Sequence, residues 1–516
     1  MFLEQICPGQ VNSQPQAIHT FVYKDDRFIV YATGSKVVVY ADPDHLVQII
    51  AASSIFQQQE QEQYLEPVTS VAGNSNTGQI AIAYRTQIAV FKPCQRQEQI
   101  VWELEGVLDT SLAIACLDWS IHNVLLSAGK EIKLWKYDDN DSTWNAVCSK
   151  LPASDIILAK FEPKSNVFAT LGKYDRIVTI WYPTKNDHDA SAAATVDYNF
   201  TLISHPKYVT HFVWRQLMGS SSNRENDCTL FTMARDGIGR FWSPTDLKQP
   251  YFLYMCAVID SNQSLVTSEV EDANHHPHHI SAEGEDDCEL DDFSPIHYIG
   301  CDELASAVNA KFRSHSKHER FDQRVDRIRD RVRDTPDLLF RIQADGSLTF
   351  WGVQHLNSVP RRIPRVFVVL RVDKAIDPLD VIYFLNPTHI LHDYSHIQSA
   401  STIKPIELSL VARNLHGQLR CYSLNLIDFL DSTSFSPRLH LKYTWLGHQH
   451  SISKLYQTQK NRFCTVGVDG QINVWKYELR EVFINKKFTP IQRDADIMLD
   501  VRQNDDSAAT RLLPVC

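Results

Sequence analysis

Hydrophobic and polar residues alternate in short runs along most of the chain, and tight polar turns join the runs in pairs. An alternation with a period of two predicts β-strands rather than helices. In eight places a run that follows a turn closes on an aromatic residue. The eight segments are GSKVVVY (34–40), RTQIAVF (85–91), GKEIKLW (129–135), DRIVTIW (175–181), DGIGRFW (236–242), DGSLTFW (345–351), HGQLRCY (416–422) and DGQINVW (469–475).

The spacing of these segments indicates a repeated four-stranded unit. Successive closing aromatics are 51, 44, 46, 61, 109, 71 and 53 residues apart. The short spacings approach the ~40–45 residues of a propeller blade, and the long ones imply loop insertions. The first unit offers strands near 18–23, 27–33, 36–41 and 46–51. We therefore predict an all-β fold, a β-propeller of seven to eight four-stranded blades with a long insertion of loop and helix. A β-sandwich would not explain eight equivalent hairpins.

Two segments are candidates for the closing strand of the ring. A propeller usually closes when one end of the chain adds a strand to the blade at the other end. FLEQI near the start and REVFINKK after Trp475 both have the character of such a strand. The sequence does not decide between them.

The last repeat, GHQHSISKLYQTQKNRFCTVGVDGQINVWKY, resembles a WD repeat. In such repeats a His, a Ser or Thr, the turn Asp and the Trp form a buried hydrogen-bonded group, which satisfies the buried carboxylate and indole. The resemblance carries these roles to His448, Thr465, Asp469 and Trp475. The other turn Asp and closing Trp pairs are Asp175 and Trp181, Asp236 and Trp242, and Asp345 and Trp351. The usual Asp after the Trp is missing in every repeat, and the Gly-His pair occurs once.

Composition and charge narrow the class of protein. Hydrophobic residues make up 43% of the 516 residues, enough for a sizeable core. The net charge of −11 argues against a nucleic-acid groove, which needs clustered Lys and Arg. No apolar run reaches the ~18 residues of a membrane helix. The eleven cysteines lack regular spacing, which fits buried thiols in a reducing, cytoplasmic compartment.

Residues 260–335 are predicted to form an insertion within a propeller domain that spans 1–477. Thirteen acidic residues lie from Asp260 to Glu303, with no Lys or Arg from 249 to 310, which predicts a mobile loop. HHPHH (275–279) lies in this loop, but a proline interrupts it, so we expect no metal site there. Residues 478–516 are predicted to be a polar tail or the start of a further domain.

The second part of the insertion, 316–334, has the pattern of a charged helix. Its apolar residues fall at steps of four, three and four, one stripe of a helix surface. The stripe predicts a helix laid on the edge of the propeller, and the basic faces make it a candidate for binding a partner. The candidate contact residues are Arg320, Arg324, Arg327, Arg329, Arg331 and Arg333.

Motifs of catalysis are not recognisable in the chain. It contains no P-loop, no HExxH, no GxSxG and no GxGxxG after a strand. We therefore expect a protein that is not an enzyme, with no catalytic residues, no cofactor and no metal. Propeller hydrolases exist, however, and fold alone does not fix function.

Several stretches resemble one family, the large WD-repeat subunit of the RAVE complex and its animal relatives, the DmX-like or rabconnectin proteins. They are ICPGQVNSQPQAIHTFVYKDDRFIVYATGSKVVVY at the start, CLDWS with LLSAGKEIKLWKY (116–137), KFEPKSNVFATLGKYDRIVTIWYP (160–183), VPRRIPRVFVVL (359–370) and WLGHQHSISKLYQ. Together they span most of 1–477. Members of the family are longer than this chain, so functions in their remaining parts are in doubt here.

Membership would imply a non-catalytic scaffold that promotes assembly of the vacuolar-type proton ATPase, and so vacuolar and endosomal acidification. The implied partners are cytosolic-sector subunits of that ATPase and the small companion subunit of the RAVE complex. The implied location is the cytoplasm, with peripheral association to endosomal and vacuolar membranes. The alternative is a WD-repeat adaptor in ubiquitin ligation or vesicle trafficking.

Overall fold

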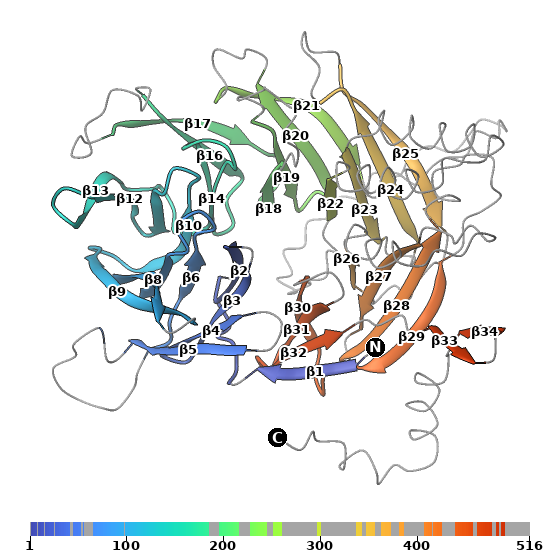
Figure 1. The fold of residues 1–516 in the computed structure, drawn as a ribbon. Helices are drawn as coiled ribbons and strands as arrows, with labels where there is room; N and C mark the ends of the chain where they lie inside the picture. The colour runs from blue at the N-terminus through green and yellow to red at the C-terminus, as the bar shows by residue number, and fades with distance from the viewer. Residues whose placement is uncertain are drawn as a thin grey trace, which may run out of the picture.

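Eight four-stranded antiparallel sheets form a ring of blades in the computed structural model (Figure 1). It describes residues 2–7, 9–14, 16–24, 26–41, 45–52, 55, 66–96, 99–184, 196–215, 228–244, 251–260, 297–300, 337–342, 347–356, 363–372, 381–385, 407–414, 416–425, 439–457, 462–476, 481–484 and 487–490. The prediction of an all-β propeller is confirmed, with eight blades rather than seven. Among the described residues there is no α-helix.

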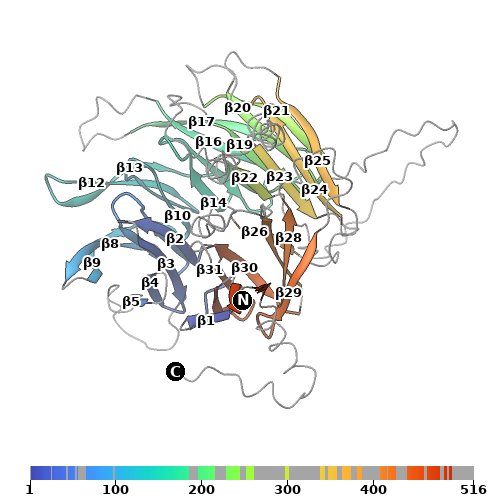
Figure 2. The same ribbon diagram turned by 45° about the vertical axis from the view of Figure 1, so that its right-hand side comes forward.

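Blades 1 to 7 each take four strands in chain order, with the first nearest the centre of the ring (Figures 1 and 2). Blades 1 to 3 contain β2 (Ile18–Tyr23), β3 (Asp26–Thr33), β4 (Lys36–Ala41), β5 (His45–Ala51), β6 (Ser70–Gly73), β7 (Ile80–Tyr84), β8 (Gln87–Arg96), β9 (Gln99–Asp109), β10 (Ile114–Trp119), β11 (Leu125–Gly129), β12 (Ile132–Asp138) and β13 (Thr143–Lys150). Blades 4 to 6 contain β14 (Ile156–Phe161), β15 (Phe168–Gly172), β16 (Ile177–Pro183), β17 (Tyr198–Ser204), β18 (Val209–Trp214), β19 (Leu230–Ala234), β20 (Ile238–Pro244), β21 (Leu253–Asp260), β22 (His297–Gly300), β23 (Asp337–Ile342), β24 (Leu348–Gln354) and β25 (Arg365–Val372).

Blade 8 closes the ring with the N-terminal strand. Blades 7 and 8 contain β26 (Val381–Leu385), β27 (Glu407–Arg413), β28 (Gln418–Asn425), β29 (His440–Leu446), β30 (Ile452–Gln457), β31 (Arg462–Gly467), β32 (Ile472–Lys476) and, as the outermost strand of blade 8, β1 (Phe2–Cys7). β1 runs antiparallel to β32, with Phe2 opposite Lys476 and Cys7 opposite Ile472. REVFINKK instead contributes to a separate hairpin, β33 (Glu481–Ile484) with β34 (Lys487–Pro490). Of the two candidates, FLEQI is therefore the closing strand.

The closing aromatic of the repeat marks a bulge in the sheet. In seven of the eight blades, the pairing of the third strand with the outermost strand shifts register at this residue. A bulge twists the strand and redirects a side chain locally. Trp181 of blade 4 is the exception, because β16 pairs with β17 without a shift.

Neighbouring blades pack face to face, and side chains of the second strand of a blade pack against both neighbouring blades. In β3, Phe28 and Val30 join a cluster with Ile80 of blade 2, whereas Ile29 and Tyr31 join a cluster with blade 8. Successive side chains of a strand point to opposite faces, so both faces of β3 are covered. This is why β7, β11, β15 and β19 are buried along their whole length.

The long insertion begins where β21 ends, at Asp260, but its predicted limits need a correction. Residues His297–Gly300 inside the predicted 260–335 segment form β22, the first strand of blade 6, with His297 opposite Phe340. A blade requires an innermost strand, and this short segment supplies it. Residues 261–296 and 301–336, which contain HHPHH and the predicted charged helix, lie outside the described residues.

Candidate functional site

Four closing tryptophans make the same buried contact. In each, the indole Nε1 donates a hydrogen bond to a Ser or Thr hydroxyl on the second strand of its own blade. The pairs are Trp135 with Ser127 (2.9 Å), Trp181 with Thr170 (2.9 Å), Trp242 with Thr232 (2.8 Å) and Trp475 with Thr465 (2.8 Å). A buried indole needs such an acceptor, so the contact fixes the third strand against the second.

In blades 5 and 8 a histidine extends this contact. His448 Nε2 lies 2.7 Å from Thr465 Oγ1, and His205 Nε2 lies 2.8 Å from Thr232 Oγ1. His205 Nδ1 also faces the carbonyl oxygen of Arg176, 3.3 Å away. A carbonyl only accepts, so Nδ1 carries the proton and Nε2 accepts from Thr232. Burial lowers the pKa of both histidines, which keeps both rings neutral at pH 7.

The turn aspartate of blade 8, Asp469, lies beside this group. Asp469 Oδ1 accepts a hydrogen bond from the backbone N of Gln471 (3.1 Å), and no hydrogen bond joins Asp469 to His448 among the described contacts. The negative charge of Asp469 nevertheless acts to raise the pKa of His448, against the larger effect of burial. The structure thus brings His448, Thr465 and Trp475 together, with Asp469 holding the adjacent turn.

Two other turn aspartates make contacts of different kinds, Asp236 within its own turn and Asp175 with the loop before β14. Asp236 accepts from the backbone N of Ile238 (3.0 Å) and pairs with Arg240 at 2.6 Å. Asp175 accepts a hydrogen bond from the hydroxyl of Ser154. Asp345 lies outside the described residues, as do all six candidate arginines of the insertion. Trp351 is buried between blades 5 and 6.

His205, which the sequence analysis missed, has only a weak sequence signal. It is followed by Pro206, whereas the Gly-His pattern at 447–448 marks His448. It also lies 27 residues before Thr232, compared with 17 between His448 and Thr465. The longer separation reflects the residues between β18 and β19, which displace the repeat from its usual spacing.

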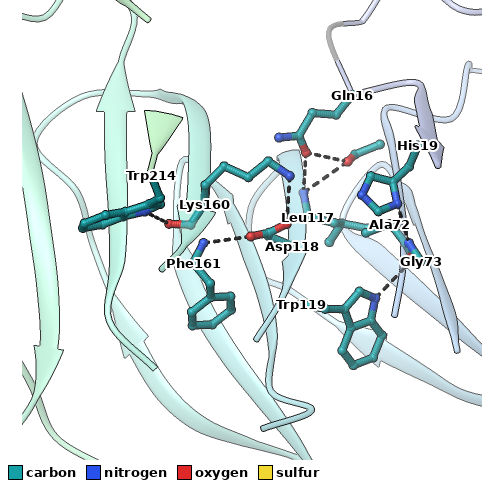
Figure 3. A network of polar contacts seen from close by, with 11 residues as sticks. Gln16, His19, Ala72, Gly73, Leu117, Asp118, Trp119, Lys160, Phe161 and Trp214 are labelled. Atoms are coloured by element: carbon teal, nitrogen blue, oxygen red, sulfur yellow. Dashed lines mark hydrogen bonds and ion pairs between the residues drawn. The ribbon is translucent and has the colours of Figure 1, made fainter. Parts of the chain in front are cut away.

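A second set of polar contacts connects the inner strands of blades 1 to 3 (Figure 3). Gln16, just before β2, accepts hydrogen bonds at Oε1 from Ser70 Oγ (3.1 Å) and from the backbone N of Leu117 (2.9 Å). The Ser70 hydroxyl also accepts from Leu117 N, at 3.1 Å. Three blades therefore meet at one amide side chain, which fixes their relative position.

The contacts continue into blades 4 and 5 (Figure 3). The Asp118 carboxylate accepts from Lys160 Nζ and from the backbone N of Phe161, both at 2.8 Å. The indole of Trp214 donates to the carbonyl of Lys160 (2.9 Å), which links blade 5 to blade 4. Trp119 makes the equivalent contact from blade 3 to Ala72 of blade 2 (3.2 Å). The signal that could have identified both tryptophans is their shared place at the end of an inner strand, in CLDW and HFVW.

His19 joins blades 1 and 2 as a hydrogen-bond acceptor. Its Nδ1 accepts from the backbone N of Gly73, 3.0 Å away. Desolvation, followed by the positive charge of Lys160, lowers the pKa of His19 to about 3. The ring is therefore neutral at pH 7, as the Gly73 contact requires.

These polar groups hold the strands of the ring together. Their hydrogen bonds join strands within a blade, neighbouring blades and, through Gln16, blades 1 and 3, and burial lowers the pKa of the histidines. Within the described part of the chain, no group of three or more His, Cys, Asp or Glu residues is arranged to hold a metal ion. The same residues contain no helix that is long and apolar enough to cross a membrane.

Comparison with solved structures gives structural alignments with two Sqt1 proteins. The crystal structure of Chaetomium thermophilum Sqt1 bound to the N-terminus of ribosomal protein L10 aligns over 91% of this chain and 99% of that chain. The TM-score is 0.46 and the sequence identity is 10%. Saccharomyces cerevisiae Sqt1 aligns over 80% and 96%, with a TM-score of 0.38 and 11% identity. The assignment of eight blades rests on the strand pairing itself.

Comparison with known sequences is more informative. No protein-family model matches the chain. DmX-like protein 1 of Mus musculus is 25% identical over 285 residues, which are 49% of this chain and 9% of that protein. The Regulator of V-ATPase in vacuolar membrane protein 1 of Saccharomyces cerevisiae is 23% identical over 251 residues, 47% of this chain and 17% of that protein. The chain thus matches only a small part of these relatives. The family resemblance seen in the sequence is confirmed at this modest identity: the chain is a homologue of DmX-like protein 1 and of the yeast regulator of V-ATPase.

Proposed function

We propose that this chain is a non-catalytic scaffold that promotes assembly of the vacuolar-type proton ATPase. The observation that carries the proposal is the homology to a yeast protein whose name is regulator of V-ATPase in the vacuolar membrane. Because the alignment covers 17% of that protein, the proposal assigns to this chain one part of such a role, the presentation of a binding surface.

The geometry supports a scaffold in two ways. The inner strands of blades 1 to 5 are joined by the contacts of Gln16, Asp118 and Trp214, which give the loops a fixed frame. In this frame, Asp118 is held by Lys160 and by the backbone N of Phe161, so its carboxylate joins two blades. In folds of this kind, a rigid body carries variable loops that bind partners.

The proposed partners are cytosolic-sector subunits of the ATPase, together with the small companion subunit of the RAVE complex. The proposed location is cytoplasmic, with peripheral association to endosomal and vacuolar membranes. The charged segment 316–334 is a proposed contact for an acidic partner surface, through its six arginines.

Co-purification with the detached cytosolic sector tests this function. The full chain, carrying an affinity tag, would be mixed with the purified sector in the presence of the companion subunit. We expect the chain to retain the sector stably. We also expect the chain to hydrolyse no ATP itself, so that its addition does not change the measured rate of ATP hydrolysis. A tagged propeller of unrelated function is the control. Absence of binding by the wild-type chain at micromolar concentration would reject the proposed role for this part of the protein.

A further inference from the structure

Two tyrosines and four basic residues lie on neighbouring loops of blades 4 and 5. They come from three short segments, the β15–β16 turn, the loop before β18 and the β19–β20 turn. We call this surface the cation–tyrosine patch, and it consists of Lys173, Tyr174, Arg176, Lys207, Tyr208 and Arg235. All but Tyr208, which is partly buried, are exposed.

The aromatic rings of the patch alternate with positive charges. The Tyr174 and Tyr208 rings meet edge to face with their centroids 5.8 Å apart. Lys173 Nζ lies 5.1 Å from the centroid of Tyr174, and Arg235 Cζ lies 5.1 Å from that of Tyr208. Such contacts hold the cations beside the rings while their remaining donors face solvent. The patch therefore offers N–H and O–H donors next to flat apolar surfaces.

Backbone hydrogen bonds fix the three segments of the patch against one another. Val209 N donates to the carbonyl of Asp175 (2.8 Å), and Arg235 N donates to that of Tyr208 (2.9 Å). Beneath them, the buried His205 ring bridges Arg176 O and the Thr232 hydroxyl. The patch is therefore arranged before any partner arrives, which reduces the entropy lost on binding.

Tyr174 has a backbone conformation that its residue type disfavours. Its φ angle is +58°, in the left-handed region where glycine is preferred. In the corresponding turns of blades 5, 7 and 8, the residues with positive φ are Gly237, Gly417 and Gly470, whereas in blade 2 the residue is Arg85 (φ +55°). The Tyr174 side chain is also 71% exposed, so burial of its ring does not offset the unfavourable backbone. The Tyr174 backbone is therefore held in place at a cost in free energy.

The charge of the patch is opposite to that of the chain as a whole. The chain carries a net charge of −11, whereas the patch carries four positive charges. Two aspartates lie on these loops, and a third, Asp155, lies in the loop before β14. Asp236 is paired with Arg240, Asp175 accepts from Ser154, and Asp155 is exposed beside Lys173, whose backbone N bonds to its carbonyl. A net positive surface remains, which favours an acidic ligand.

We propose that the cation–tyrosine patch binds an acidic, extended segment of a partner protein. Carboxylates would accept hydrogen bonds from Lys173, Arg235 and the tyrosine hydroxyls, and the peptide backbone would lie across the Tyr174 ring. This inference stands independently of the ATPase role, because it rests on the geometry and charge of the patch alone.

The test uses a fluorescein-labelled twelve-residue peptide of alternating Glu and Ser, with its Gln-for-Glu counterpart as a neutral probe. Fluorescence anisotropy with the full chain is expected to show binding of the acidic probe only, weakened by 0.5 M salt. The double reversal Lys173→Glu with Arg235→Glu should weaken binding by roughly tenfold or more, equivalent to about 1.4 kcal/mol. Equal binding of both probes, or equal affinity of the reversed variant, would overturn the proposal.

Two variants separate binding from folding. Tyr174→Gly removes the strain of a left-handed backbone at a non-glycine residue, so it should maintain or raise the melting temperature. The same variant should bind the acidic probe at least about threefold more weakly. Lys24→Glu is the matched control, because Lys24 lies over the Tyr23 ring (5.4 Å) on the turn between β2 and β3 of blade 1, and we expect it to leave binding unchanged. A loss of binding only in proportion to lost stability would contradict a role for Tyr174.

Other occupants have distinct outcomes. The acidic residues of this chain's own 283–292 segment can be neutralised by substitution. If this raises the affinity for the acidic probe more than about tenfold, that segment occupies the patch and the partner proposal fails. If vesicles rich in phosphatidylserine bind through the patch and the acidic probe does not, the ligand is a membrane surface and the proposal also fails.

Discussion

The indole nitrogen of Trp475 donates a hydrogen bond to the hydroxyl oxygen of Thr465 across 2.8 Å, and the same oxygen lies 2.7 Å from Nε2 of His448. One hydroxyl thus connects the third strand of blade 8, its second strand and the loop that enters the blade. Blade 5 repeats the arrangement with Trp242, Thr232 and His205 in these places.

We expect Thr465→Val to destabilise the protein by roughly 2–5 kcal/mol. Valine has the shape of threonine but lacks the hydroxyl, so His448 and Trp475 would each lose a buried partner at about 1–3 kcal/mol. Urea unfolding followed by tryptophan fluorescence measures the change. Thr465→Ser is the control, since it retains the oxygen, and it should cost much less. Equal losses for the two variants would mean that the methyl group, not the hydroxyl, matters.

Within the same blade, Trp475→Ala and Asp469→Ala should differ in their effects. The Trp475 side chain is 5% exposed, so its removal leaves a cavity at a cost of about 3–5 kcal/mol. Among the described contacts, Asp469 accepts the Gln471 N–H in the turn, and its loss should cost about 1 kcal/mol. Differential scanning calorimetry of both variants shows which substitution destabilises the protein more. A larger loss for Asp469→Ala would show that the carboxylate supports His448 more than the hydrogen bonds indicate.

Acid should destabilise the protein partly through His19. Its pKa is about 3 in the folded protein against an ordinary value of 6.5, so the unfolded state binds the proton more readily. The stability that the neutral ring contributes is present above pH 6.5 and is lost as the pH falls toward 3, by up to about 1.4 kcal/mol per pH unit. His205 and His448, with lowered pKa values, act in the same direction.

The variant His19→Asn tests this contribution. An Asn side-chain oxygen can accept the Gly73 N–H in place of Nδ1 but does not titrate. Unfolding free energies measured from pH 7 to 4.5 should fall less steeply for the variant than for the wild type. Parallel curves would assign the acid sensitivity to other groups.

The sequence was sufficient to predict what depends on local chemistry. The strands of the first blade were expected at 18–23, 27–33, 36–41 and 46–51, and they lie at Ile18–Tyr23, Asp26–Thr33, Lys36–Ala41 and His45–Ala51. Alternation and turn residues encode such boundaries within a few neighbouring positions. The strand β22 was missed because it has four residues and lies between two long polar segments.

Contacts between blades could not be predicted, because they depend on how the ring closes. Gln16 contacts Leu117 across 101 positions of sequence, and nothing near Gln16 distinguishes it from a loop amide. The role of Asp469 was transferred by analogy, and the analogy did not specify that its carboxylate accepts from Gln471. Both cases depend on positions of atoms that the repeat pattern leaves undetermined.

Charge reversal of the six insertion arginines should weaken binding to the detached ATPase sector if segment 316–334 is a contact. The variant replaces Arg320, Arg324, Arg327, Arg329, Arg331 and Arg333 with Glu. Attraction to an acidic surface becomes repulsion, and salt should diminish the difference. Co-purification and melting temperature would be measured together. Equal binding by both proteins would leave the scaffold proposal in place and remove this segment from it.

Deletion of residues 1–8 should open the ring and destabilise all of blade 8. β1 supplies the outermost strand of that blade, so β32 would lose its partner along Ile472 to Lys476. Tyr31 of blade 1 and Val466 of blade 8 belong to one hydrophobic cluster. Without β1, blade 8 would no longer be held firmly enough to keep this cluster packed. We expect the melting temperature to fall by more than about 5 °C.

Thiol labelling gives this deletion a local readout. Cys464 lies on β31 and is fully buried, so it should react with a thiol reagent much faster in the deleted protein than in the wild type. A chain ending at residue 480 is the matched control, because it lacks only the β33–β34 hairpin and the residues C-terminal to it, and that hairpin forms its own sheet. If both truncations exposed Cys464 equally, or if neither did, closure by β1 would not be what secures the eighth blade.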